Sequence, residues 1–493
     1  MMGAEKALEP AKVPGVSRVI GLDLRSLGLW RIALGLVLLI DWLTRSFHFR
    51  AHYTAEGILP LRAYLNLPDL SIRLWSVFYL NDAPWFVGLL FALGTLSALA
   101  LTLGYRTTWS GWIAWVLLVS LHHRNPLVLT KGDSYLSLLI FWGNFLPWGK
   151  AFSLDGGVGE DLARPHQSVA GVAYLFQVCF LYWFTALLRT GPSWQVDGSA
   201  LYLSYNLESL VKEPAYLLLG LGPQWLSLFT FLPLAFEVVG PFLLLLPWPW
   251  TRVLGVVLII FFHLGIHLTL ELSTFAWVCM AGPIGLLPSR CWQLPAGRGL
   301  EKALGSGFAR LAGAIPLSWS SHQPPSPGLR WRSVGQILPA LALLAVSGYL
   351  WCDLKGSSPN GWGMRLARVA GLSQSWGMFS PSPPIIHGWQ SIEARSRSGL
   401  IFDLITRQPY PAGQYQGQHS WIDQRWGIYR EMIRQNGFGN NANLYLRYLV
   451  ARWDQQHPED PIVAADYIWH ARVTLPDYLL PEYGREVMAR YRR

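Results

Sequence analysis

One apolar segment carries three side chains that can bind metal ions. The segment VLGVVLIIFFHLGIHLTLEL contains His263, His267 and Glu271 at intervals of four residues, which places them on one face of a helix. Imidazole and carboxylate groups on such a face can hold a metal, with further ligands such as His122 and His123 from neighbouring helices. A polar seam of hydrogen bonds between helices explains the same spacing. The chain has no second matching motif, so the spacing favours the seam and leaves a metal site as the alternative.

Other ionisable residues interrupt the apolar segments. Glu237 lies in the middle of FLPLAFEVVGPFLLLL, too far from either end to reach water easily. We expect it to be protonated or to face the interior of the bundle beside a base, because a lone charge at membrane depth is costly. Arg31 and Asp41 lie nearer the ends of an apolar segment. The simpler interpretation is that both reach the membrane surface along their own side chains.

The stretch HHRNPLVLTKGDSYLSLLIFWGNFLPWG, residues 122–149, places several charges against the start of an apolar run. Asp133 stands where a carboxylate can cap a helix and meet the positive end of its dipole. Lys131 and Arg124 are close enough in sequence to neutralise this carboxylate. Capping explains the cluster by itself, and a position at the border of a buried pocket is the functional alternative.

These groups must be positioned by a membrane domain. The 493-residue chain has 26 Trp and 14% charged residues, whereas roughly a quarter of the residues in a soluble domain are charged. Its net charge of +10 fits Lys and Arg flanking membrane segments and does not indicate nucleic-acid binding. The four cysteines show neither disulfide nor zinc spacing. Nine segments approach the length that spans a bilayer: 27–46, 84–104, 107–122, 133–148, 168–189, 225–247, 252–271, 273–288 and 334–352.

The loop 289–333 sets the expected orientation of the protein. It contains six Arg or Lys residues and one acid, Glu301, and such an excess is retained in the cytoplasm. The segments before this loop then leave the N-terminus in the cytoplasm, and the last segment carries the tail outside. The first 25 residues lack the apolar core of a cleaved signal peptide. We expect an integral protein of a bacterial inner membrane, or an equivalent membrane, with a cytoplasmic N-terminus and an extracytoplasmic C-terminal domain.

The predicted fold is an all-α multi-pass membrane bundle of about 8–9 transmembrane helices, followed by a small α+β extramembrane domain. Within residues 190–224, the piece ALYLSYNLESLVKEPAYLLLGLG (200–222) is expected to form an interfacial helix. In the tail, QSIEARSRSGLIFDLI predicts a β-hairpin around Ser398 and Gly399, VAADYIWHARVTLP predicts a strand, and residues 421–436 and 441–456 predict amphipathic helices. The expected division is an N-terminal cytoplasmic segment (1–25), a transmembrane domain (26–290), a basic cytoplasmic linker (291–333), the last transmembrane helix (334–352) and the α+β domain (353–493).

Several pieces of the chain, in order, resemble the horizontally transferred transmembrane domain (HTTM) proteins, which belong to the superfamily of vitamin K-dependent gamma-carboxylase. The most specific piece is RNPLVLTKGDSYLSLLIFWGNFLPWGKAFSLDG, residues 124–156. The resemblance covers most of residues 25–290 and a patch in the tail. The other matching pieces are HYTAEGILP (52–60), YWFTALLRTGPSWQVDGSAL (182–201), FEVVGPFLLLL, FFHLGIHLTLELSTFAWVCMAGPIGLLP and WGMFSPSPP (376–384).

This resemblance has consequences for individual residues. The carboxylase uses reduced vitamin K, oxygen and carbon dioxide to convert protein glutamate to gamma-carboxyglutamate, with a lysine as the base. The position that matches this lysine holds Arg189, which keeps its proton at working pH. Gly132 and Asp133 stand where the carboxylase has an Asn-His pair. We therefore do not expect gamma-glutamyl carboxylation. Arg189, with Trp194 close by, would instead bind an anionic head group or a quinone ring, or anchor the helix at the membrane surface.

Together, the resemblance and the buried polar groups predict one polar pocket within the membrane domain. Its candidate catalytic residues are Asp133, Arg189, Glu237 and His263, with Trp194 beside the bound cofactor. The expected ligand is a quinone or a lipid and not a metal. The expected partners are the lipid bilayer and a lipid or exported-protein substrate, without nucleic acid. A non-catalytic membrane scaffold or assembly factor is the alternative function.

Overall fold

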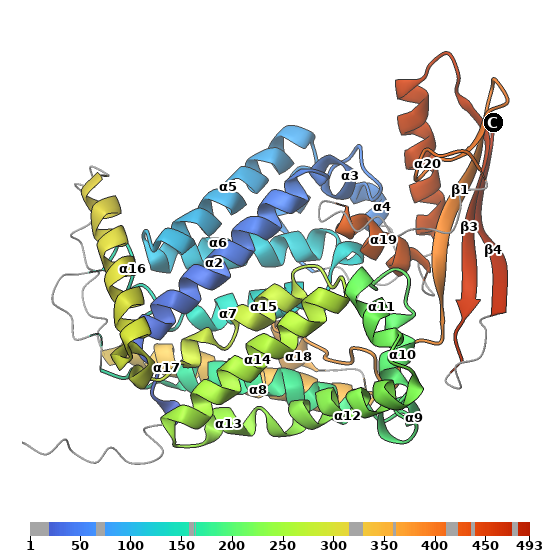
Figure 1. The fold of residues 1–493 in the computed structure, drawn as a ribbon. Helices are drawn as coiled ribbons and strands as arrows, with labels where there is room; N and C mark the ends of the chain where they lie inside the picture. The colour runs from blue at the N-terminus through green and yellow to red at the C-terminus, as the bar shows by residue number, and fades with distance from the viewer. Residues whose placement is uncertain are drawn as a thin grey trace, which may run out of the picture.

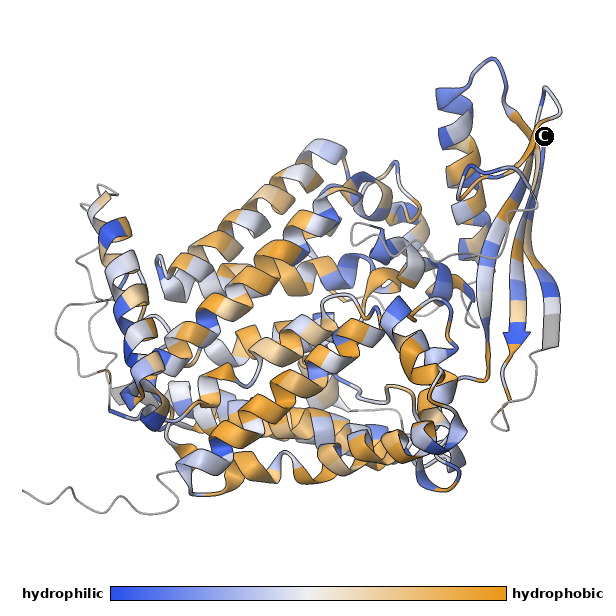
Figure 2. Ribbon diagram, viewed as in Figure 1, coloured by the Kyte–Doolittle hydropathy of each residue, from blue (hydrophilic) through white to orange (hydrophobic). Residues whose placement is uncertain are grey.

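The protein is a bundle of helices with a small sheet domain at one end (Figure 1). The structure, a computed structural model, describes residues 19–65, 74–156, 162, 164–314, 329–357, 361–410, 423–434, 439–475 and 482–493. Apolar residues cover the helices of the bundle, whereas polar residues gather on the outlying helices and on the strands (Figure 2). The chain is therefore an integral membrane protein with a domain of different composition attached to it.

Six helical segments in the described part of the chain are long and apolar enough to cross a membrane. Three further predicted segments are helical but shorter or more polar: α6 (Thr107–Arg124), α7 (Lys131–Gly143) and α15 (Phe275–Ala281). Their length and composition do not by themselves establish the predicted eight to nine crossings. The six apolar segments are α2 (Leu24–Ser46), α5 (Pro84–Leu103), α8 (Val169–Leu188), α12 with α13 (Pro223–Val239 and Phe242–Leu245), α14 (Pro249–Thr269) and α17 (Leu329–Leu354).

Local sequence explains where these helices end and how closely they pack. Gly104 follows α5 with a φ of 64°, a left-handed conformation that glycine adopts without strain, and its N–H bonds the last turn. Gly35 of α2 lies directly against Thr102 of α5, where any Cβ atom would collide with the backbone. Small residues allow this close approach of membrane helices, which pack without a hydrophobic driving force between them.

Residues 200–222 do not form one continuous helix as predicted, and neither does the longer segment 190–224. The segment is broken into α9 (Pro192–Gln195), α10 (Ala200–Tyr205) and α11 (Glu213–Leu219). Gly198 has a φ of 67°, and Pro214 requires a new helix start, so one continuous helix is not possible. The short helices pack against α12 and α14.

The C-terminal domain has a four-stranded antiparallel sheet in the order β2-β1-β3-β4. The predicted hairpin is confirmed by β1 (Ile386–Ser396) and β2 (Ile401–Asp403), and the two predicted helices are α19 (Gln424–Arg434) and α20 (Gly439–Gln456). The predicted strand is β3 (Ile462–Val473), while β4 (Glu482–Arg492) was not predicted. Its arginines gave no apolar alternation, and charged residues of this kind protect an exposed edge strand from aggregation. The remaining elements are α3 (Phe49–Tyr53), α4 (Leu61–Leu65), η2 (Val77–Tyr79), η3 (Pro126–Val128), η4 (Ile284–Leu286), η5 (Ser289–Gln293), α16 (Pro295–Ala314) and α18 (Trp362–Val369).

The basic segment and the C-terminal domain lie at opposite ends of α2. At the first turn of α2, Arg25 pairs with Glu301 of α16 at 3.2 Å. Near its last turn, Asp41 pairs with Arg425 of α19 at 2.7 Å. Figure 1 shows α16 and the sheet at the two ends of the bundle. A helix of this length is about 35 Å long, enough to separate two membrane surfaces.

Candidate functional site

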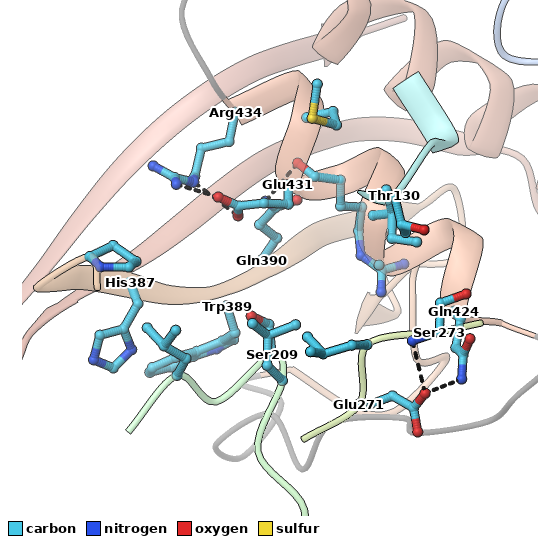
Figure 3. A pocket seen from close by; sticks show the side chains of 18 of the residues that line it. Thr130, Ser209, Glu271, Ser273, His387, Trp389, Gln390, Gln424, Glu431 and Arg434 are labelled. Atoms are coloured by element: carbon cyan, nitrogen blue, oxygen red, sulfur yellow. Dashed lines mark hydrogen bonds and ion pairs between the residues drawn. The ribbon is translucent and has the colours of Figure 1, made fainter. Parts of the chain in front are cut away.

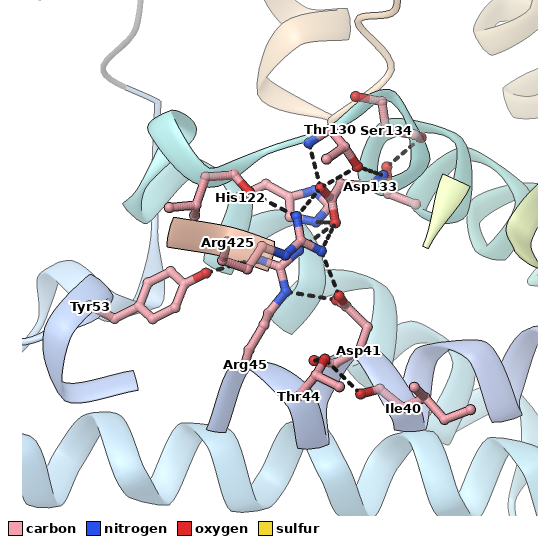
Figure 4. Close-up of polar contacts among 12 residues, drawn as sticks. Ile40, Asp41, Thr44, Arg45, Tyr53, His122, Thr130, Asp133, Ser134 and Arg425 are labelled. Atoms are coloured by element: carbon pink, nitrogen blue, oxygen red, sulfur yellow. Dashed lines mark hydrogen bonds and ion pairs between the residues drawn. The ribbon is translucent and has the colours of Figure 1, made fainter. Parts of the chain in front are cut away.

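Four buried charges meet where the C-terminal domain touches the bundle (Figure 4). Arg425 of α19 reaches Asp41 at 2.7 Å and Asp133 at 2.6 Å. Arg45 bridges the same two carboxylates, with 2.8 Å to Asp41 and a closer contact to Asp133. The two positive and two negative groups neutralise one another. Removing any one of them would leave an uncompensated buried charge.

Local structure holds each of these groups in place. Asp41 and Arg45 are four residues apart and share one face of α2. The Thr130 backbone N–H donates to the Asp133 carboxylate at 2.6 Å in a capping box, so the predicted capping role of Asp133 is present. Arg45 also donates to the Tyr53 hydroxyl at 2.7 Å.

The sequence interpretation of the charges in this region was partly wrong. Asp41 and Arg31 do not extend into the surroundings of the protein, since both side chains are fully buried inside it. Arg31 instead donates to backbone carbonyls, including that of Trp148 at 3.2 Å. Arg45 and Arg425, not Lys131 and Arg124, neutralise Asp133. Arg425 was missed because its partners are distant in the chain.

Arg189 and Glu237 form a second buried pair. Arg189 follows the last residue of α8, and its guanidinium lies 2.6 Å from the Glu237 carboxylate of α12. The same guanidinium lies over the Trp194 ring, 3.9 Å from its centroid. Trp194 donates its indole N–H to the Phe379 carbonyl at 2.8 Å. The Arg189 guanidinium, which was expected to bind a head group or a quinone, therefore already contacts Glu237 and Trp194.

The histidines of α14 do not come together with Glu271 as the alternative metal site requires. His263 lies 3.0 Å from the Tyr182 hydroxyl, and His267 packs against another ring, that of Trp277. The helix ends at Thr269, so Glu271 leaves the predicted face and pairs with Lys212 at 2.8 Å. Across the described ranges, no three His, Cys, Asp or Glu side chains are grouped to hold a metal.

The four candidate catalytic residues have different close partners. Arg189 and Glu237 lie together with Trp194, whereas Asp133 belongs to the four-charge network and His263 pairs with Tyr182. None of the four lines the large cavity found in the structure. Each of the four residues thus has a close partner, although the buried atoms Arg189 Nε and His263 Nδ1 make no hydrogen bond in the described part of the chain.

The large cavity lies between the bundle and the C-terminal domain and has a volume of about 460 Å³ (Figure 3). Small-molecule sites usually have about 300–1,000 Å³. The bundle and its loops contribute both polar and apolar residues, and β1 with α19 contributes mostly polar ones. The bundle and its loops supply Thr130, Lys131, Leu207, Ser209, Leu210, Glu271, Leu272, Ser273 and Phe275, while Trp389, Gln390, Gln424, Ile428 and Met432 are among those from the C-terminal domain.

Most ionisable groups around this cavity are already paired. Glu271 contacts Lys212, and Glu431 accepts from Arg434 at 3.1 Å. His387 lies 2.8 Å from the Thr474 hydroxyl. Burial lowers the pKa of His387 to about 4, and the Arg472 charge acts in the same direction. This imidazole is therefore neutral at physiological pH.

Comparison with known proteins identifies the bundle. The model of the HTTM domain matches residues 21–287, more than half of the chain. The chain belongs to the HTTM family. No curated protein and no solved structure matches it.

The four-charge network contains residues from inside and from outside the HTTM domain. Asp41, Arg45 and Asp133 lie within the matched residues, whereas Arg425 lies beyond them. The four-charge network thus joins the HTTM domain to a domain outside it. The cavity has one wall from each, so it exists only when the two are docked.

Proposed function

We propose that this HTTM protein binds an amphiphilic molecule, such as a lipid or a quinone, in the cavity between its HTTM domain and its C-terminal domain. The observation that carries the proposal is that the cavity combines apolar and polar side chains. Leu207, Leu210 and Phe275 offer apolar surface to a hydrocarbon chain. Ser209 and the side-chain carbonyl of Gln424 offer hydrogen bonds to a head group. A few placed polar groups on an apolar lining are typical of ligand sites.

Gamma-glutamyl carboxylation is not part of this proposal. The base of a carboxylase must be unprotonated before it can accept a proton. Arginine stays protonated far above working pH. The carboxylate of Glu237, 2.6 Å from Arg189, stabilises the charged guanidinium further. The pair therefore supports a structural role for Arg189 at the end of α8.

The proposal includes an orientation in the membrane. The basic segment with α16 faces the cytoplasm, and the C-terminal domain with the cavity faces the other side. The opposite placement of Glu301 and Arg425 along α2 supports this orientation, as does the excess of positive charge in residues 289–333. We further propose that the number of crossings is odd, since an odd number places the N-terminus and the C-terminal domain on opposite sides of the membrane.

Native mass spectrometry of protein purified in mild detergent tests the binding function. We expect wild-type protein to retain a copurifying amphiphile. The double variant Leu210→Trp and Ile428→Trp fills the cavity and should retain it at least tenfold less. Leu187→Trp, at an exposed position on α8, is the matched control and should retain it like wild type. Equal retention in all three proteins, or none in any, would favour the scaffold function instead.

A further inference from the structure

We propose that Lys131 is the anion-binding residue of this cavity and that the bound amphiphile carries an acidic head group, a carboxylate or a phosphate. This inference rests on the proposed function, because it names the class of ligand that the same cavity takes. Lys131 is the first residue of α7 and lines the cavity beside Thr130.

Lys131 has no close partner in the structure. Among the residues that the structure describes, its ammonium makes neither a hydrogen bond nor an ion pair within 4.0 Å. The acid that influences it at longer range is Asp353 of α17. Lys131 is half-buried, so its charge is only partly hydrated. An acidic ligand would supply the missing counter-charge.

The carboxylates that line the cavity cannot supply this counter-charge. Glu271 is held by Lys212 at 2.8 Å, and Glu431 is held by Arg434. Asp423 lies 2.9 Å from His48. Because these acids are paired with other groups, the ammonium of Lys131 stays available to a ligand.

The apolar lining determines the rest of the ligand. Leu272, Phe275 and Met378 line the same cavity as Lys131, and further apolar side chains come from the C-terminal domain. A small hydrophilic anion would leave these surfaces without contact, whereas an acyl chain would cover them. The chemistry thus selects an acid with a hydrocarbon chain, either a free fatty acid or a lipid phosphate.

Binding of labelled probes to the full-length protein in detergent tests this inference. The probes are oleate, oleoyl lysophosphatidate and neutral oleyl alcohol, each measured by native mass spectrometry. Wild-type protein should bind at least one acidic probe tenfold or more tightly than oleyl alcohol, and the preferred probe tells the two sources apart. Lys131→Gln should lose this preference while it still binds the alcohol, and Lys131→Arg should keep most of it. Lys302→Gln, on exposed α16 at the other end of the bundle, is the matched control and should bind like wild type.

The two proposals fail in different ways. If Lys131→Gln keeps the full preference for acids while the cavity-filling double variant loses all probes, only the role of Lys131 is overturned. If the cavity-filling variant binds every probe as well as wild type does, the binding function of the cavity is overturned as well.

Discussion

Arg425 of α19 lies 2.7 Å from Asp41 of α2, although 384 residues separate them in the chain. The contact is buried and is shared with Arg45 and Asp133. A buried ion pair contributes less to stability than its geometry suggests, but loss of one partner leaves an uncompensated charge. The pair therefore fixes how the C-terminal domain docks onto the HTTM domain.

Replacing Arg425 with Gln should destabilise the protein by about 3–5 kcal/mol, because two buried carboxylates would share the single charge of Arg45. Thermal unfolding in detergent measures the change, and limited proteolysis should cut the C-terminal domain more rapidly. Arg485→Gln is the control, since its pair with Glu393 is exposed and should contribute at most about 1 kcal/mol. Equal effects of the two variants would contradict the docking role of Arg425.

Arg189→Gln and Glu237→Gln should each lower the unfolding temperature, because each leaves the other charge buried without its partner. The double variant should cost less than the sum of the single ones, since it removes both charges together. A double-mutant cycle of thermal unfolding measures this coupling. Strictly additive losses would show that the pair does not act as a unit.

Acidification should destabilise the docked protein through His387. Its folded pKa of about 4 lies below the unfolded value of about 6.5, so the unfolded chain binds more protons between these two pH values. Stability should therefore be complete above pH ~6.5 and fall as the pH drops toward 4. Unfolding temperatures measured across this range should show a shallower decline for His387→Gln. Parallel curves for the two proteins would count against this assignment.

The orientation can be measured with single cysteines. In a background with Cys291 and Cys352 replaced by Ser, we expect Ser398→Cys to react with a membrane-impermeant maleimide in intact spheroplasts. Ser306→Cys, on α16, should react only after permeabilisation. Both positions are exposed, so a difference reports the side of the membrane. Labelling of Ser306→Cys in intact spheroplasts would reverse the proposed orientation.

Local patterns in the sequence predicted the elements better than the site. Apolar runs located the membrane helices, and the turn at Gly399, with a φ of 89°, located the hairpin. The face shared by His263, His267 and Glu271 was extended past Thr269, where the helix ends. Periodicity cannot reveal such an end when no glycine or proline marks it.

The docking network and the cavity could not be predicted from local patterns. Arg425 stands in WIDQRWGIYR, where it resembles an ordinary solvent-facing residue of an amphipathic helix. Its burial depends on Asp41 and Asp133, which come from two helices of another domain. The cavity likewise has walls from distant segments. The sequence did indicate that buried charges require partners, but it did not indicate which ones.

Photo-crosslinking with a diazirine-bearing oleate tests the central claim most directly. The wild-type protein is irradiated with the probe, and the modified peptides are mapped by mass spectrometry, with and without excess unlabelled oleate. Binding in the cavity predicts competed labelling on both walls, near Leu207 and Leu210 and near Ile428 and Met432. Labelling confined to lipid-facing helices such as α5, and unaffected by competitor, would contradict it.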